Sequence, residues 1–296
     1  MGKVPGLYSD ISKKTRDLLH KDHSSNTVKF RPDAPPGLAI TSSMKNGVYM
    51  STISTQLKER NVTADINFKL GKHPNIFTNI VLDQRHLLPG LKAICNFNAF
   101  EPKSQMIGLH YLHDCAGKPG INANIIGLTR TPILNFSGLL GHNTAALGTN
   151  VSFDTKTGKF ATCSAMISFG YAGLIASFNL NDKGNTLNAS YYHKVRGKLS
   201  KETNIFQRAL ATLSITAVGA EATHKFSTTV NTITIGMQFG LGRLTTLKAR
   251  VKHTGMASVV MQTKWNRKSL ITTSAEVDIK ALNKTPKLGL AFSTRS

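Results

Sequence analysis

The sequence predicts an all-β protein, a transmembrane antiparallel β-barrel of about 19 strands preceded by one amphipathic helix. Three observations support this: apolar and polar residues alternate along most of the chain, no run approaches the ~18 apolar residues of a spanning helix, and the polar positions are rich in lysine and arginine. A strand sends successive side chains to opposite faces, so each alternating segment is a ribbon with one apolar and one polar face.

The charge of the chain limits its partners. Its 296 residues carry a formal net charge of +22, from 37 Lys and Arg against 15 Asp and Glu. A charge of this size is typical of proteins that meet nucleic acid, a membrane surface or small anions. The basic residues are spread over the whole chain, which argues against a single arm that grips a phosphate backbone.

The N-terminal region has a helical period. One stripe recurs every three or four positions, formed by Leu7, Ile11, Thr15 and Leu18. This predicts an amphipathic helix over residues 7–20, with Lys13, Lys14 and Arg16 mostly off the stripe. A surface helix packed on a core and a mitochondrial presequence are the alternatives, and two acidic residues, Asp10 and Asp17, weaken the second.

From residue 27 to about 295 the period is two. The clearest runs are residues 62–70, 147–154, 174–181, 232–239 and 271–280, and short turn signals rich in Gly, Asn and Asp separate them. Segments of roughly 10 residues have the length of tilted membrane strands. We expect residues 1–296 to form one domain, with residues 195–214 as an atypical long loop that contains a short helix.

The segment 247–252 indicates which way the basic face points. Lys248, Arg250 and Lys252 alternate with apolar residues there, and Lys69 has the same place in the run 62–70. A lysine or arginine that faces lipid near the midplane costs roughly 2–4 kcal/mol. Three of them would cost up to about 6–12 kcal/mol, comparable to the stability of a whole domain. We therefore assign these four residues to a water-filled lumen, where they attract anions.

Signs of catalysis or cofactor binding are weak. Cys95, Cys115 and Cys163 lie far apart and show no zinc or disulfide spacing. His110 and His113 are three positions apart, so on a strand they face opposite ways. We expect no catalytic residues, no cofactor and no metal.

Several stretches carry a family resemblance that covers nearly the whole chain. They are Pro5–Tyr8, Lys13–Lys14, Arg16–Leu19, Pro89–Lys92, His113–Asp114, Ala116–Gly117, Thr131–Gly138, Leu180–Gly184, Leu187–Tyr192 and Leu244–Val251. In these stretches the chain resembles the mitochondrial outer-membrane porins, the voltage-dependent anion channels, and is most similar to their plant branch. It departs from them at Gly242-Arg243 and Lys252-His253, at Thr294, and in the length of segment 195–214.

The resemblance implies a barrel in the mitochondrial outer membrane with the N-terminal helix inside the pore. It implies passive exchange of anions and metabolites such as ATP and ADP, and closure at high membrane potential. The triplet Gly90-Leu91-Lys92 matches the family's proposed nucleotide-contact motif. Lys13, Lys14 and Arg16 are then candidates for sensing voltage. The lipid bilayer is the expected partner, a homo-oligomer is allowed, and nucleic acid is not the main ligand.

Three alternatives stay open. A protein-import pore of the same fold would conduct basic peptides, and a basic lumen argues against it. A soluble nucleic-acid-binding β-protein would need aromatic stacking platforms, and aromatic residues are only 7% of the chain. A paralogue that inserts into the membrane but conducts poorly fits the same pattern.

Overall fold

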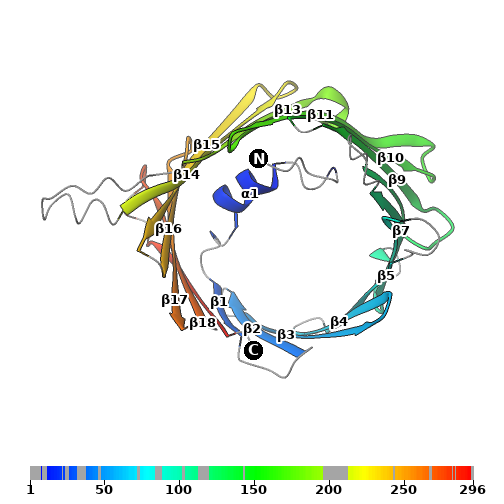
Figure 1. Cartoon of the computed structure of the whole chain (residues 1–296), viewed down its shortest axis with the longest axis horizontal. Coiled ribbons are helices and arrows are strands. Elements are labelled where there is room, and N and C mark those ends of the chain that lie inside the picture. The colour runs from blue at the N-terminus through cyan, green and yellow to red at the C-terminus, as the bar shows by residue number, and fades with distance from the viewer. Residues whose placement is uncertain are drawn as a thin grey trace, which may run out of the picture.

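In the part of the chain that the structure describes, nineteen strands form one sheet that closes on itself, with α1 inside the ring (Figure 1). The bounds are α1 Lys13–Leu19, β1 Thr27–Arg31, β2 Leu38–Lys45, β3 Val48–Glu59, β4 Val62–Leu70, β5 Asn75–Asp83, β6 Leu91–Asn98, β7 Met106–Leu112, β8 Gly120–Ile126, β9 Ile133–Gly141, β10 Ala145–Asp154, β11 Lys159–Tyr171, β12 Leu174–Asn181, β13 Thr186–Lys194, β14 Leu213–Lys225, β15 Val230–Leu241, β16 Thr245–Lys252, β17 Met256–Asn266, β18 Ser269–Asp278 and β19 Lys287–Thr294.

The computed structural model describes residues 8, 12–21, 23, 27–31, 38–45, 48–71, 74–83, 89–101, 104–112, 120–142, 144–195, 213–242, 244–266, 269–281, 283 and 285–294. Most of the predicted segment 195–214 lies outside these residues, as do residues 7 and 9–11 of the predicted helix. Among the described residues, no helix is long and apolar enough to span a membrane.

Each strand pairs with the next in the chain, and β1 pairs with β19 to close the ring. Consecutive pairs are antiparallel, whereas the closing pair is parallel, with Val28 opposite Leu290. When an odd number of strands alternate in direction around a closed ring, one pair of neighbouring strands must be parallel. The predicted strand count and the closed architecture are therefore confirmed, and the antiparallel meander has this single exception.

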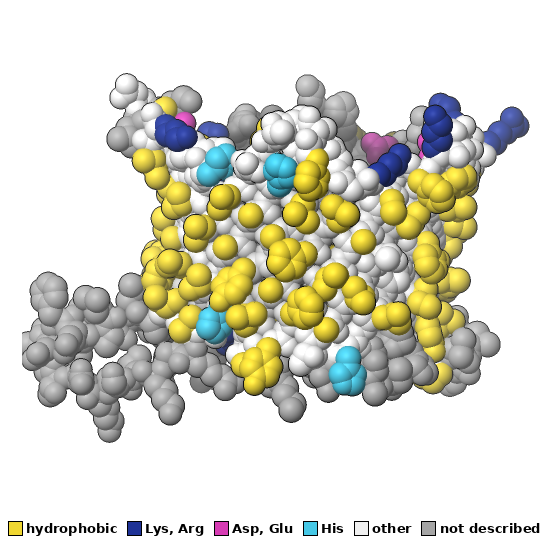
Figure 2. Space-filling model, turned by 90° about the horizontal axis from the view of Figure 1, so that it is seen from above, with side chains coloured by type: hydrophobic (Ala, Val, Ile, Leu, Met, Phe, Trp, Pro, Cys, Tyr) yellow, Lys and Arg dark blue, Asp and Glu magenta, His cyan; other side chains and the backbone are white. Residues whose placement is uncertain are grey.

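The alternation predicted for the strands is visible in the wall. β4 and β12 have the bounds of two predicted runs, 62–70 and 174–181. On the outer face of β11 to β15, hydrophobic side chains form a broad belt, with Lys and Arg gathered at one rim (Figure 2). Large apolar residues stay exposed there, such as Phe178 at 52% and Ile235 at 49%. A water-soluble sheet would bury such a belt, so the belt marks the surface that meets lipid.

Buried apolar side chains gather where the N-terminal segment touches the inner wall. One cluster is Leu139, Ala146 and Met166, with Tyr8 packed against it. The other is Leu18, Leu19 and Ala217, with Tyr192 beside it. The apolar contacts of the lumen therefore serve to hold the N-terminal segment against the wall.

Candidate functional site

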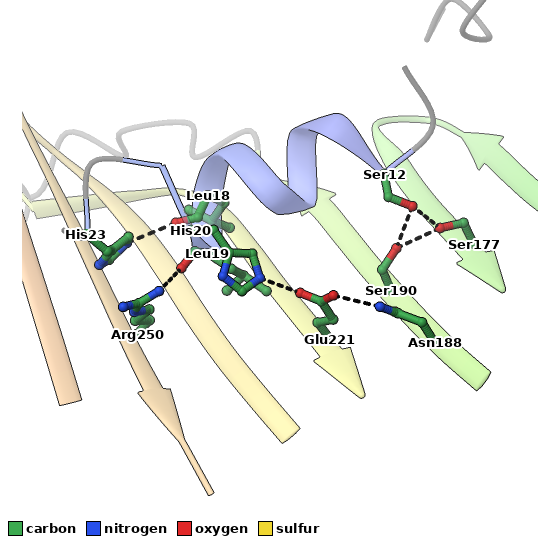
Figure 3. A network of polar contacts seen from close by, with 10 residues as sticks. All are labelled: Ser12, Leu18, Leu19, His20, His23, Ser177, Asn188, Ser190, Glu221 and Arg250. Carbon is green, nitrogen blue, oxygen red and sulfur yellow. Dashed lines mark hydrogen bonds and ion pairs between the residues drawn. The ribbon is translucent and has the colours of Figure 1, made fainter. Parts of the chain in front are cut away.

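The candidate site is the inner wall of β12 to β18 together with α1, which lies against it (Figures 1 and 3). The helix is seven residues long, and Thr15, Leu18 and Leu19 are its buried residues. A helix this short is not stable in water alone. Its stability must come from the wall.

Two glycines form the seat of the helix. Gly219 on β14 is paired directly with Gly236 on β15. A Cβ built on Gly219 would lie 2.8 Å from Cδ2 of Leu18, and one built on Gly236 would lie 2.6 Å from Cδ2 of Leu19. Both distances are shorter than a real Cβ contact, so a side chain at either position would force the leucine above it to shift, whereas glycine lets the two leucines lie close to the strand backbone.

Two cations of β16 hold the C-terminal end of α1. Arg250 donates from Nη1 to the carbonyl oxygen of Leu19 at 2.7 Å and from Nη2 to Oε2 of Glu276 at 3.1 Å. Lys248 donates from Nζ to the carbonyl oxygen of Asp17 at 3.3 Å. Both side chains are only 8% exposed. The last carbonyls of a helix lack internal partners and carry partial negative charge, which explains why cations bind here.

The N-terminal end of α1 is held by hydroxyl groups. Ser12, Ser177 and Ser190 form a triangle in which Ser177 and Ser190 are 2.6 Å apart and Ser190 donates to Ser12 at 3.0 Å (Figure 3). Ser12 occupies the N-cap position with φ 58 and makes no side-chain cap bond to the helix. Its hydroxyl bonds the wall instead of capping the helix.

Beside this triangle, His20 and Glu221 join the helix to β14. Nε2 of His20 lies 2.6 Å from Oε2 of Glu221, and Asn188 donates to the other oxygen at 2.8 Å. Ser190 and Glu221 are paired across β13 and β14, so the serine triangle and this pair belong to one row of the wall. The row bonds both ends of the helix.

His23 locks the chain as it leaves the helix. It is 2% exposed, with Nε2 at 3.1 Å from the carbonyl oxygen of Leu18 and Nδ1 at 2.9 Å from Oγ of Ser258. Burial first, and then the charge of Arg250, lower the pKa of His23 to about 4. The ring is therefore neutral at pH 7, so Nε2–H donates to the Leu18 carbonyl and Nδ1 accepts from Ser258.

The residues predicted from the sequence fall into three places. Lys248 and Arg250 lie under the helix, and their donors are directed at its carbonyls. Lys69 and Lys252 stand at the ends of β4 and β16 on the lumenal faces of these strands. The helix residues Lys13, Lys14 and Arg16 are exposed. Their proposed roles in attracting anions and sensing voltage stay predictions.

The triplet at 90–92 lies across the ring from α1, where Gly90 ends a turn and Leu91 and Lys92 begin β6 between β5 and β7 (Figure 1). Gly90 has φ 92, and a Cβ there would clash with the carbonyl oxygen of Leu112, so the turn itself requires glycine. Lys92 pairs with Asp83 and His110. A contact between Gly90, Leu91, Lys92 and nucleotides stays a prediction, and the triplet does not join the helix site.

Sequence reasoning missed the residues that dock the helix: Ser12, His20, His23, Gly219, Glu221 and Gly236. A signal was present for the two glycines, because a glycine inside an alternating strand often marks a close backbone approach. For the metal prediction, no group of three potential ligands is found in the part of the chain that the structure describes.

Comparison with known proteins gives a consistent result. A family model described as eukaryotic porin matches residues 4–289. Two Solanum tuberosum relatives, the mitochondrial outer membrane protein porins of 34 kDa and 36 kDa, are 46% and 47% identical over 100% of both chains. The Pisum sativum outer plastidial membrane protein porin is 43% identical over the same extent. The chain belongs to the eukaryotic porins.

Proposed function

We propose that this porin is a weakly anion-selective, voltage-dependent channel through which small anions and metabolites, including ATP and ADP, cross the mitochondrial outer membrane. Members of its family are channels and not enzymes. The observation that carries the proposal is a closed wall of 19 strands with an apolar outside and lysines on its lumenal face. Barrels of 16–18 strands already leave an aqueous channel, so solutes need no catalytic step to pass.

Four lysines at one mouth support the anion preference. They are Lys69, Lys225, Lys252 and Lys287, here called the mouth lysines, at the ends of β4, β14 and β16 and the start of β19. Even-numbered strands end where β19 begins, so all four lie at the same mouth. The alternation of side chains places each of them on the lumenal face. Lys225 lies four residues after lumenal Glu221, and Lys252 lies two residues after lumenal Arg250. Lys69 and Lys287 are adjacent to Phe68 and Leu288, which face outward.

The preference should be modest. At physiological salt the Debye length is about 8 Å, so charges on the wall of a wide pore are partly screened at its axis. The mouth lysines raise the local concentration of anions without excluding cations. Chains of phosphate groups, such as those of nucleotides, are attracted more strongly than chloride because they carry several charges.

Replacing the four mouth lysines by glutamate should turn the anion preference into a cation preference. The test is the reversal potential of single channels in a planar bilayer with a salt gradient, first for the wild type and then for the variant. Lysine-to-arginine changes at the same positions keep the charge and should keep the wild-type value. A wild type that prefers cations, or one that inserts without conducting, would overturn the proposed function.

Voltage dependence is assigned to the helix charges. One elementary charge moved across the full field is worth roughly 2.3 kcal/mol per 100 mV, so a few charges moved part of the way bias open against closed states. Lys13, Lys14 and Arg16 are exposed on α1, which is attached to the wall by side chains rather than by strand pairing.

Changing these three residues to glutamine should make closure less steep with voltage. The control changes Lys156, Lys159 and Lys183, which are exposed at the mouth, and removes the same charge from fixed turns and strand ends. Steady-state conductance against voltage is measured for both variants. An identical slope in the helix variant and the wild type would exclude the helix as the sensor.

The membrane is assigned from the relatives. Both Solanum tuberosum proteins are named for the mitochondrial outer membrane, whereas the Pisum sativum protein is named for the outer plastidial membrane. Fractionation of the two organelles decides between them, and recovery with plastid membranes alone would overturn the mitochondrial assignment.

A further inference from the structure

A polar pocket lies between α1 and the inner wall. Its volume is about 220 Å³. Ser12, Thr15 and Arg16 line it on the helix side, and residues of β11 to β14 line it on the wall side. Ser12 of the helix meets Ser190 of the wall at this place, with Glu221 on the next strand (Figure 3). A molecule held in the pocket would therefore touch the helix and the wall together.

Two asparagines on the wall side carry unpaired amide oxygens. Asn179 on β12 and Asn188 on β13 are paired directly in the sheet, and both line the pocket. Nδ2 of Asn188 donates to Glu221 at 2.8 Å, which fixes the orientation of this amide. The Oδ1 atoms of both asparagines are buried and accept no hydrogen bond from the residues that the structure describes. A buried acceptor without a donor is costly, so these amides favour a ligand that supplies donors.

The charges of the pocket disfavour a strongly charged ligand. Among the described residues that line it, the charged ones are Arg16 and Glu221. A phosphate group would meet the Glu221 carboxylate, and an ammonium group would meet the Arg16 guanidinium, so neither finds surroundings of the opposite sign only. Both carboxylate oxygens of Glu221 already accept hydrogen bonds, from His20 and Asn188. The pocket therefore suits a neutral solute.

The remaining lining groups match a molecule rich in hydroxyl groups. The hydroxyls of Ser12, Thr15 and Ser190 and the amides of three asparagines line the pocket. Both kinds of group donate and accept, as sugar hydroxyls do. Tyr8 and Met166 give it an apolar side, and pockets that combine such a side with a few polar groups orient their ligands well. The volume equals that of about seven water molecules at ~30 Å³ each, which is room for one monosaccharide.

We propose that this pocket binds a small neutral polyol, such as a monosaccharide, and that the bound molecule holds α1 to the wall. Its hydroxyl groups donate to the asparagine amides of the wall and exchange hydrogen bonds with Ser12 and Thr15 of the helix. Because the site is complete only while α1 is docked, binding and docking stabilise each other. The inference goes beyond conduction and does not depend on the ion preference of the pore.

The test is hydrogen exchange of the full chain in detergent, followed by mass spectrometry while glucose is added. At roughly ten times the dissociation constant of glucose, exchange in residues 12–20 should be about tenfold slower, and the effect should saturate. Sugars also stabilise folded proteins because they are excluded from the surface, but that effect does not saturate and acts on the strands as well. Saturation-transfer NMR of glucose reports the contact directly.

Asn179→Leu removes one amide of the pocket. The hydrogen bonds described for α1 come from other residues, so exchange of the helix without glucose should match the wild type, whereas the glucose effect should be lost. Asn181→Leu, at the end of β12, is a second variant that should act in the same way. Asn135→Leu is the matched control, because its Oδ1 is also buried and unpaired but it lies on β9, outside the strands that line the pocket. It should keep the glucose effect.

A wild type that shows no saturable response to glucose in either measurement would overturn the proposal. So would a response that both Asn179→Leu and Asn181→Leu leave unchanged, or one that Asn135→Leu removes equally. Protection of the helix by glycine instead of glucose would also overturn it, because the pocket would then select a zwitterion and not a neutral polyol.

Discussion

Replacing Gly236 by valine is expected to release α1 from the inner wall. The first new carbon would lie 2.6 Å from Cδ2 of Leu19 and 3.1 Å from the carbonyl oxygen of Ala249, so the Leu19 side chain must turn away, or the helix or the strand must move. Overpacking of this kind costs about 1–3 kcal/mol. The helix is the weaker element, because strand β15 is held by backbone bonds to both neighbours.

Release of α1 would also expose its apolar residues. Leu18 and Leu19 are 3% and 0% exposed, and burial of a leucine is worth about 1.5–3 kcal/mol. That burial opposes release equally in the wild type and the variant, so the overpacking cost of about 1–3 kcal/mol sets the difference, and it raises the open fraction of the local equilibrium about 5- to 150-fold. We therefore expect amide hydrogens of residues 12–20 to exchange faster by a factor in this range, measured by mass spectrometry in detergent, while strand amides stay protected.

Gly170→Val is the control for this experiment. Gly170 lies near the end of β11 on the lumenal side, and a Cβ there would be 3.8 Å from the carbonyl oxygen of Leu174, an ordinary van der Waals distance. Exchange in residues 12–20 should then match the wild type. If Gly236→Val left the helix as protected as before, the glycine pair would not be what holds the helix.

Replacing Arg250 by methionine is expected to lower the stability of the barrel by about 3–5 kcal/mol, the usual effect of removing one member of a buried ion pair. The Arg250 and Glu276 side chains are 8% and 13% exposed, so Glu276 would keep its charge in a poorly hydrated place. The carbonyl of Leu19 would lose its donor in the same change. Thermal unfolding in detergent measures the first effect, and hydrogen exchange of the helix the second.

A double variant separates these effects. Arg250→Met with Glu276→Leu removes both charges, so most of the barrel stability should return, whereas the helix should stay loosely held. Lys252→Met, two residues along the same face but at the mouth, should change stability by only about 0.5 kcal/mol. An Arg250→Met protein that unfolds at the wild-type temperature would show that the ion pair contributes nothing to stability.

The pattern of the strands could be predicted because it depends on neighbouring residues only. In β4, β12 and β16 the alternation of side chains fixes which residues face lipid and which face water, and lipid cannot accept a row of cations. The parallel pairing of β1 and β19 also follows from an odd number of strands. The number of strands was harder to predict, because the alternation of apolar and polar residues is clear in some segments and weak in others.

The helix site could be predicted only in part. The apolar stripe of residues 7–20 was visible, and the observed α1 covers residues 13–19 of it. Its place inside the barrel was implied only by the family resemblance, and its contacts with the wall were not predicted, because docking depends on pairs of residues far apart in the chain. Arg250 and Leu19 are 231 positions apart, and no local pattern indicates that a cation of β16 meets the carbonyls of the helix. The pocket between α1 and the wall was missed for a similar reason, since its lining belongs to the helix and to strands β11 to β14.

The sequence alone predicted that this chain is a lipid-facing tube of strands with a basic lumenal face, because an alternating period of two and the cost of cations in lipid favour that arrangement. Only the tertiary structure decided what the cations of that face do. The register of the strands places Gly236 between Gly219 and Arg250 in the sheet, so this part of the basic wall holds α1. The mouth lysines lie outside this contact and face solvent. The physical reason is that side-chain alternation is a local property, whereas the pairing of strands with a docked helix is set by closure of the whole ring.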